Sequence, residues 1–166
     1  MSYIGIDPSA IAQPGTVLQV QKAITEGIQL INSASMAEIN GLIIDFTPKS
    51  ANSTIILEAM ISTSDTHVTS FGFWKDNVTM RTVSGSNNNG TDNLVTSYHS
   101  ANGSATDDIR QIFLLDYETN TSTTTREYAI RCMASWSTTN YNLYINDRGN
   151  DDMASFSTFT IWEVQN

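Results

Sequence analysis

Apolar and polar residues alternate along most of the chain. In residues 54–62 (TIILEAMIS) this spacing separates two faces, one of which carries Ile55, Leu57, Ala59 and Ile61. Successive side chains of a strand point to opposite faces, so the spacing predicts a strand with one face in a core. Residues 155–164 repeat the pattern, with Phe159, Ile161 and Glu163 on one face and Thr158, Thr160, Trp162 and Val164 on the other.

Turn signals divide the chain into short strands. Pro14-Gly15 and Thr47-Pro48 mark turns, and Asp76-Asn77 is a two-residue hairpin candidate, because Asn and Asp tolerate positive φ. We expect strands at residues 16–24, 42–46, 54–62, 68–75, 78–83, 94–98, 109–118, 126–135, 141–145 and 155–164. The strongest predicted strand pair is 109–118 with 126–135, joined by the polar segment 119–125.

This succession of eight to ten short strands predicts an antiparallel β-sandwich of jelly-roll type over residues 16–166. Residues 1–15 form an N-terminal arm that precedes the predicted sandwich. Residues 26–40 combine weak helical spacing with glycine, serine and asparagine, and are predicted to be strand and loop.

The composition is polar without being highly charged. Ser, Thr and Asn make up 55 of the 166 residues, whereas charged residues reach only 15%, against roughly 25% in an average domain. The net charge of −9 argues against binding to nucleic acid or to anionic membranes. No apolar run approaches the ~20 residues that span a bilayer, and no signal peptide is visible. The single cysteine, Cys132, is expected to be a buried, inert thiol.

The residues offer little catalytic chemistry. His67 and His99 are the two histidines, and no nucleophile-elbow, zinc-protease or phosphate-loop motif accompanies them. Carboxylates within predicted strands make a glycoside-hydrolysing pair conceivable; they are Asp116, Glu118, Glu127 and Glu163. Solvated charge explains them more simply, as it does Asp107-Asp108. We therefore expect no catalytic residues and no cofactor.

One loop is rich in oxygen ligands. Residues 146–152 (NDRGNDD) include Asp147, Asp151 and Asp152, which are weak candidates for calcium ligands. Their spacing does not fit the helix-loop-helix calcium pattern. A turn with internal hydrogen bonds from side chain to backbone is the favoured interpretation, so no metal is expected.

Aromatic residues raise the question of ligand binding. Most are expected to fill the core, in clusters at residues 71–74, 141–144 and 156–162. Trp136, beside serines and a threonine at a strand end, is the best candidate for exposure. Speculative ligand-binding residues are Trp136, Asn88, Asn102 and Tyr98, which lie in or next to polar segments.

Two segments carry a family resemblance. Residues 40–57 (NGLIIDFTPKSANSTIIL) combine an apolar strand ending in Thr-Pro, a Ser/Ala/Asn turn and an Ile/Leu strand, and a Gly-aromatic strand with a polar hairpin follows at 71–77. Residues 143–164 supply Asn-Asp-Arg, Asn-Asp-Asp and an aromatic-Glu-Val ending. In this order the motifs resemble virion structural or tail-fibre proteins of marine and cyanobacterial phages.

The resemblance implies a virion protein made in the cytoplasm of an infected bacterium. As a homotrimeric short tail-fibre or receptor-binding module, it would attach noncovalently to a host surface glycan. Contact would come through segments 84–92, 100–108 and 119–125, while the arm anchors the module to other virion proteins. The alternative is a capsid decoration or head-fibre protein that binds the phage shell, and a glycan-degrading enzyme is a third, less favoured class.

Overall fold

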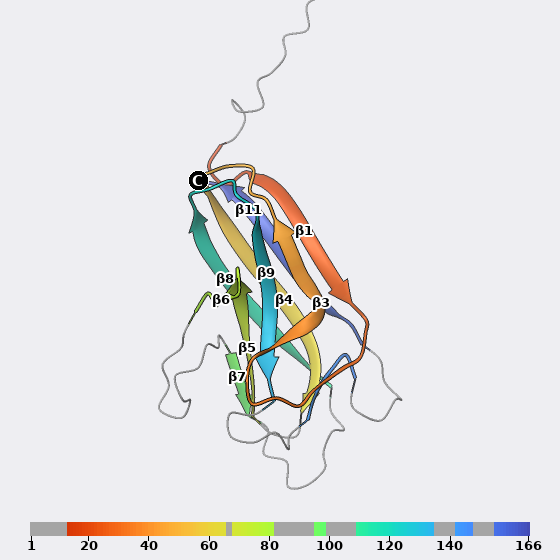
Figure 1. Ribbon diagram of the computed structural model, residues 1–166. Helices are drawn as coiled ribbons and strands as arrows, with labels where there is room; N and C mark the ends of the chain where they lie inside the picture. The colour runs from red at the N-terminus through yellow and green to blue at the C-terminus, as the bar shows by residue number, and fades with distance from the viewer. Residues whose placement is uncertain (1–12, 66–67, 82–94, 99–108, 135–141, 148–154) are drawn as a thin grey trace, which may run out of the picture.

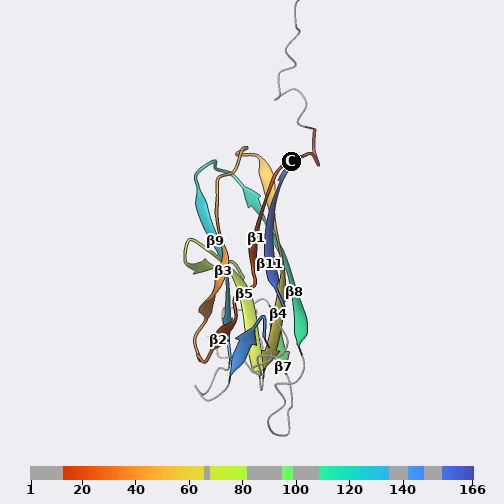
Figure 2. The same ribbon diagram turned by 90° about the vertical axis from the view of Figure 1, so that its right-hand side faces the viewer.

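The computed structural model describes residues 13–65, 68–81, 95–98, 109–134, 142–147 and 155–166. Within these ranges the chain forms two antiparallel sheets packed face to face (Figure 1). Figure 2 views the sandwich from the side, with β3 and β9 on one side and β4, β8 and β11 on the other. The predicted all-β sandwich is confirmed, and the jelly-roll connectivity stays a prediction. In the same ranges no helix is long and apolar enough to cross a membrane.

The larger sheet, called sheet A below, has six strands in the order β1-β11-β4-β10-β2, with β8 paired to β4. Its strands are β1 (Val17–Thr25), β2 (Gln29–Ile31), β4 (Ser53–Asp65), β8 (Arg110–Asn120), β10 (Leu143–Ile145) and β11 (Ser157–Gln165). The central strand is β4, which pairs along most of its length with β8 on one side and with β11 and β10 on the other.

The smaller sheet, sheet B, has five strands in the order β3-β9-β5-β6, with β7 also paired to β5. They are β3 (Ala37–Phe46), β5 (Val68–Lys75), β6 (Val78–Thr79), β7 (Val95–Tyr98) and β9 (Arg126–Met133). The predicted Asp76-Asn77 turn joins β5 to β6, and its residues have φ angles of 50° and 64°. Two positive φ values define the tight hairpin turn that matches strand twist. The strand and loop predicted for residues 26–40 are confirmed as β2, a turn and the start of β3.

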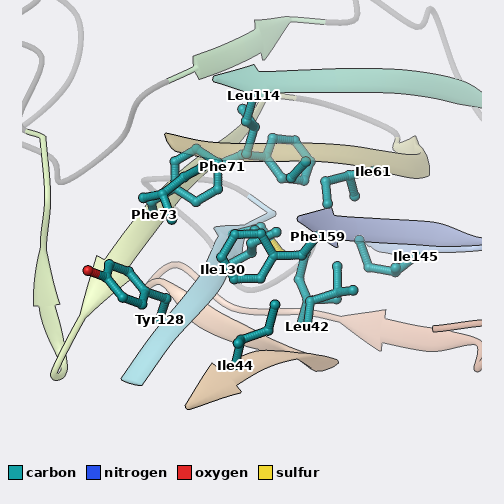
Figure 3. Close-up of a cluster of buried hydrophobic side chains, with 14 of the residues drawn as sticks. Leu42, Ile44, Ile61, Phe71, Phe73, Leu114, Tyr128, Ile130, Ile145 and Phe159 are labelled. Carbon is teal, nitrogen blue, oxygen red and sulfur yellow. The ribbon is translucent and has the colours of Figure 1, made fainter. Parts of the chain in front are cut away.

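The core lies between the two sheets and is built from alternate side chains. In β4 and β11, one of the two faces that alternation separates is fully buried: Ile55, Leu57, Ala59, Ile61, Phe159, Ile161 and Glu163. Aromatic and aliphatic side chains from sheet B complete the cluster drawn in Figure 3, where the Phe73 and Phe159 rings pack with centroids 5.6 Å apart. Cys132 is fully buried as predicted, and burial raises the pKa of its thiol.

One expected pairing is wrong. β8 and β9 form close to where they were predicted, yet they belong to different sheets. β8 pairs with β4, from Ser53 opposite Asn120 to Thr63 opposite Arg110, whereas β9 lies between β3 and β5. The polar segment between them therefore crosses between the sheets. Packed sheets lie about 10 Å apart, a distance that a few extended residues span easily.

The sandwich has two distinct ends along its strands. At the end we call the entry end, the Gly15 backbone N–H donates to the Gln165 carbonyl at 2.8 Å. Residues 47–52 and 121–125 lie at this same end, because Thr54 is in register with both Val164 and Thr119. The opposite, far end carries the Ser157 end of β11, the Arg110 end of β8 and Tyr98 of β7.

Candidate functional site

Most of the sequence-predicted site residues lie outside the described residues. Those residues are Asn88, Asn102, Trp136, Asp151, Asp152, His67 and His99. Tyr98 ends β7, opposite Val68 of β5, at the far end. Of the predicted ligand-contact segments, 84–92 and 100–108 lie outside the described residues, and residues 121–125 lie at the entry end, away from Tyr98.

The outward side of sheet A is the broadest candidate surface. Side chains of β1, β11, β4 and β8 lie in register there as four rows across the sheet. We call these rows the outer face; they are Val17, Val164, Thr54, Thr119; then Val20, Trp162, Ile56, Tyr117; then Lys22, Thr160, Glu58, Leu115; and Ile24, Thr158, Met60, Phe113. Ten of these sixteen side chains are apolar or aromatic.

Several of the apolar side chains on the outer face are more than half exposed. The exposed fraction is 63% for Tyr117, 58% for Phe113 and 56% for both Leu115 and Ile24. Single exposed apolar residues are normal on soluble proteins, whereas a contiguous patch marks an interaction site. The outer face is therefore a candidate contact surface for a protein partner.

Charge on the outer face is sparse and balanced. Lys22 and Glu58 are the only charged side chains in the four rows, and neither forms an ion pair within the described part of the chain. The chain as a whole carries a net charge of −9. The outer face is thus electrically neutral on an acidic molecule.

Sheet B presents a different outward side. Its exposed positions include Asp45 and Ile43, while Arg131 pairs with Glu38 at 3.6 Å and lies over the Trp74 ring at 5.4 Å. This side thus carries charged side chains from both β3 and β9, and Trp74 on it is buried. The contrast between the two sheets singles out sheet A as the apolar surface.

One short stretch of the sequence also indicates that the outer face is apolar. Residues 112–115 (IFLL) are apolar at four consecutive positions, so both faces of that strand are apolar. Strands buried on both faces have such continuous runs, whereas strands with one solvated face alternate. In a sandwich, where each sheet has an outward side, such a run indicates a covered outer surface.

A second candidate site is a pocket of about 530 Å³ at one side edge of the sandwich. There the β5–β6 hairpin of sheet B faces β8 of sheet A. The lining residues are Lys75, Val78, Thr79, Met80, Arg81, Tyr117, Glu118 and Thr119. Of the two carboxylates considered from the sequence for β8, Glu118 lines this pocket and Asp116 binds Arg81, another lining residue.

Arg81 closes one part of the pocket edge by binding β8. Its Nε donates to both carboxylate oxygens of Asp116, at 2.9 and 3.0 Å. Its terminal nitrogen also donates to the Tyr117 carbonyl at 3.1 Å, on the free edge of β8. The hydrogen bond to Asp116 and the charge of that carboxylate raise the pKa of Arg81. Asp116 itself is almost fully buried.

Glu118 lies two residues further along the same inward side of β8. One carboxylate oxygen accepts from the Lys75 ammonium and the other from the Tyr128 hydroxyl. Burial, followed by the hydrogen bond to Glu118, raises the pKa of Tyr128. Asp116 is therefore bound by Arg81, which follows β6, and Glu118 by Lys75 of β5, and the arrangement links the two sheets at their edge.

Glu163, another of the strand carboxylates, is the centre of a hydrogen-bond cluster at the entry end. It accepts from the backbone N–H groups of Lys49 and Ser50 and from the side chains of Gln19 and Ser53, at 2.7–2.9 Å. Burial alone would raise its pKa, but these hydrogen bonds outweigh burial and lower it. Glu163 thus fixes the turn that carries the chain from β3 to β4.

The calcium candidate can be followed only as far as residue 147. The side chain of Asn146 donates to the Thr25 and Gly27 carbonyls and accepts from the Ser157 hydroxyl. Asp147 is buried, with one carboxylate oxygen that has no hydrogen-bond partner. Among the residues that the structure describes, no three His, Cys, Asp or Glu side chains are grouped to hold a metal. The expectation of a metal-free turn at residues 146–152 therefore stays a prediction, and calcium stays its weak alternative.

Comparisons with known proteins add no family. No protein-family model matches the chain, and no curated protein matches it.

Proposed function

We propose that this protein is a structural subunit of a phage virion, working as a homotrimeric short tail-fibre or receptor-binding module. The observation that carries the proposal is the apolar outer face of sheet A. A surface of this kind is characteristic of subunits that are covered by neighbours in an assembly. The motif resemblance of residues 40–57 and 143–164 to virion proteins supplies the kind of assembly.

The two ends of the sandwich support a division of labour. The N-terminal arm leads into the entry end at Gly15, which suits attachment to the particle through other virion proteins. Host contact then belongs at the far end, where Tyr98 lies. From the sequence, segment 119–125 is expected to contact the host. Because residues 121–125 lie at the entry end, we do not propose host contact through them.

Attachment to a host surface glycan is proposed to be noncovalent and multivalent. Three identical far ends on one module bind together, so that modest affinity per site becomes high overall avidity. The two carboxylates of β8 near the side pocket are each paired with a cation, Asp116 with Arg81 and Glu118 with Lys75. That pairing supports a linking role for them in preference to glycan hydrolysis.

Particle location and glycan binding test the proposal separately. Electron cryo-microscopy of the virion, with the protein labelled, is expected to place it on the tail with the entry end toward the particle. The trimer is expected to bind host-surface glycans on an array, and a monomeric variant to bind at least about 100-fold more weakly. Location on the head shell without glycan binding would replace this proposal by the capsid decoration alternative. Sugar release from host polysaccharide would overturn the noncatalytic proposal.

A further inference from the structure

We infer that the outer face of sheet A packs against the outer faces of neighbouring copies of this chain, with Lys22 of one copy opposite Glu58 of the next. The packing axis runs parallel to β11. This inference rests on the proposed homotrimer and deepens it, by naming the surface, the charge pair and the direction of the axis.

The charges on the outer face are arranged for self-pairing. Lys22 on β1 and Glu58 on β4 lie in the same row, on either side of Thr160 on β11. Two strand spacings, about 9.6 Å, separate their backbones within one chain. Neither side chain has an ion-pair partner within the described ranges. A second copy of the chain can supply each of them with the opposite charge.

The position of this pair selects the axis. An axis parallel to β11 sets β1 of one copy against β4 of the next, so that Lys22 meets Glu58. A twofold axis across the strands would instead set Lys22 against Lys22, and like charges in an interface are strongly disfavoured. The parallel axis also brings the entry ends of all copies to one side. A module anchored by one end and binding by the other needs this arrangement.

The apolar rows above and below the charge pair would supply the stabilising contact. Trp162 lies near the middle of the outer face, between Val20 and Ile56 in its row. Large aromatic residues at the centre of an interface commonly contribute most of its binding energy. Aligning β1 of one copy with β4 of the next brings Val20 against Ile56 and Ile24 against Met60, so apolar side chains face apolar side chains.

The size of the outer face suits a specific contact. Strand spacing and residue rise give four rows across four strands a footprint of roughly 500 Å² per copy. Three such footprints meet around the axis of a trimer and together reach about 1,500 Å², above the lower limit of about 1,000 Å² for a specific protein contact. Because the outer face is neutral, two acidic chains can meet there without bringing like charges together.

Charge reversal at the two positions tests the inference. Lys22→Glu and Glu58→Lys, each alone, are expected to raise the dissociation constant of the assembly at least about tenfold, because each creates a like-charge pair at every interface. The double reversal, Lys22→Glu with Glu58→Lys, restores the pair and is expected to recover wild-type assembly. Native mass spectrometry and sedimentation equilibrium at micromolar concentration measure both the stoichiometry and the affinity.

Mixing separates pairing between chains from any effect within one chain. An equimolar mixture of the two single variants is expected to form oligomers that contain both chains. Asp45→Lys, on the exposed side of sheet B, changes the charge by the same amount as Glu58→Lys and is the matched control, expected to assemble like the wild type.

The possible outcomes distinguish this inference from the proposed function. A wild-type trimer unaffected by the single reversals, or not recovered by the double reversal, would overturn the Lys22–Glu58 contact and leave the homotrimer standing. A wild-type chain that stays monomeric would overturn both the contact and the trimer. Virion location and glycan binding, measured separately, then decide whether the remaining proposal survives.

Discussion

At the scale of single residues, buried polar side chains hold the ends of this sandwich in place. Glu163 at the entry end accepts four hydrogen bonds, and Asn146 joins the ends of β1, β4 and β11. Both side chains are fully buried. A buried polar group is costly without partners and adds fold specificity when every donor and acceptor is satisfied. These residues therefore act structurally, whatever the molecule binds.

Glu163→Gln is expected to destabilise the fold by about 2–4 kcal/mol at pH 7, because two of the four donors would then face an amide NH₂ instead of an acceptor. Urea unfolding measures the change. Glu127→Gln, which replaces a half-buried carboxylate of β9 in the same way, is the control and is expected to change stability by less than about 0.5 kcal/mol.

The same substitution carries a pH signature. The folded-state pKa of Glu163 is lowered, so its contribution is fully present above the unfolded pKa of about 4.3 and is lost as the pH falls through the folded value. Wild type and Glu163→Gln should therefore converge in stability as the pH is lowered below about 4. A difference that persists unchanged into acid would contradict the assigned role of the carboxylate.

The Asp76-Asn77 turn makes a separate residue-scale prediction. Asn77 has a φ of 64° and its side-chain oxygen accepts from Arg131. Both Asn77→Gly and Asn77→Ala remove that hydrogen bond, but only glycine adopts positive φ without cost. We expect the glycine variant to be more stable than the alanine variant by about 1 kcal/mol. Asn40, a strand residue without positive φ, should give the opposite order in the same thermal measurement.

At the scale of elements, the two sheets are joined at one side edge by ion pairs. Arg81, which follows β6, reaches Asp116 of β8, and Lys75 of β5 reaches Glu118. β8 is an edge strand of sheet A, and inward-pointing charges together with a covering side chain discourage unwanted pairing along such an edge. The two ion pairs beside the side pocket therefore link the two layers of the sandwich.

The ion pair between Arg81 and Asp116 predicts that two arginine substitutions change stability unequally. Arg81→Met leaves the nearly buried Asp116 carboxylate without its cation, whereas Arg126→Met opens a solvent-exposed pair with Asp76. Exposed ion pairs contribute little, while removing the partner of a buried charge is costly. We expect the urea midpoint to fall clearly for Arg81→Met and hardly for Arg126→Met. Equal urea midpoints in the two variants would show that the Arg81–Asp116 ion pair has no structural role.

Element positions were predictable from alternation, and their partners were not. The strand predicted at residues 68–75 is β5 with the same bounds, and the one at 16–24 is β1 shifted by one residue. Alternation reports which side chains face the core, because it has the period of the strand. It is silent on which strand lies alongside, and so β8 and β9 were expected as neighbours although they lie in different sheets.

At the scale of the whole molecule, the apolar outer face decides behaviour in solution. A partner that binds only the folded state raises the unfolding temperature with concentration. The wild type should therefore melt at a higher temperature at 100 µM than at 1 µM. Ile24→Glu, on the outer face, should remove this dependence, while Ile43→Glu, an exposed isoleucine of sheet B, should retain it. Calorimetry at the two concentrations would contradict the interface if both variants behaved alike.

The sequence by itself determined the fold class, most strand positions, which side chains share a face in β4 and in β11, and the burial of Cys132. Each of these follows from local alternation and turn chemistry, which neighbouring residues already contain. Only the tertiary structure decided which strands pair, since that depends on contacts between distant segments. It alone aligned Lys22, Thr160 and Glu58 in one row, because register brings together side chains from three separate strands. It also brought Arg81 to Asp116 across the gap between the sheets.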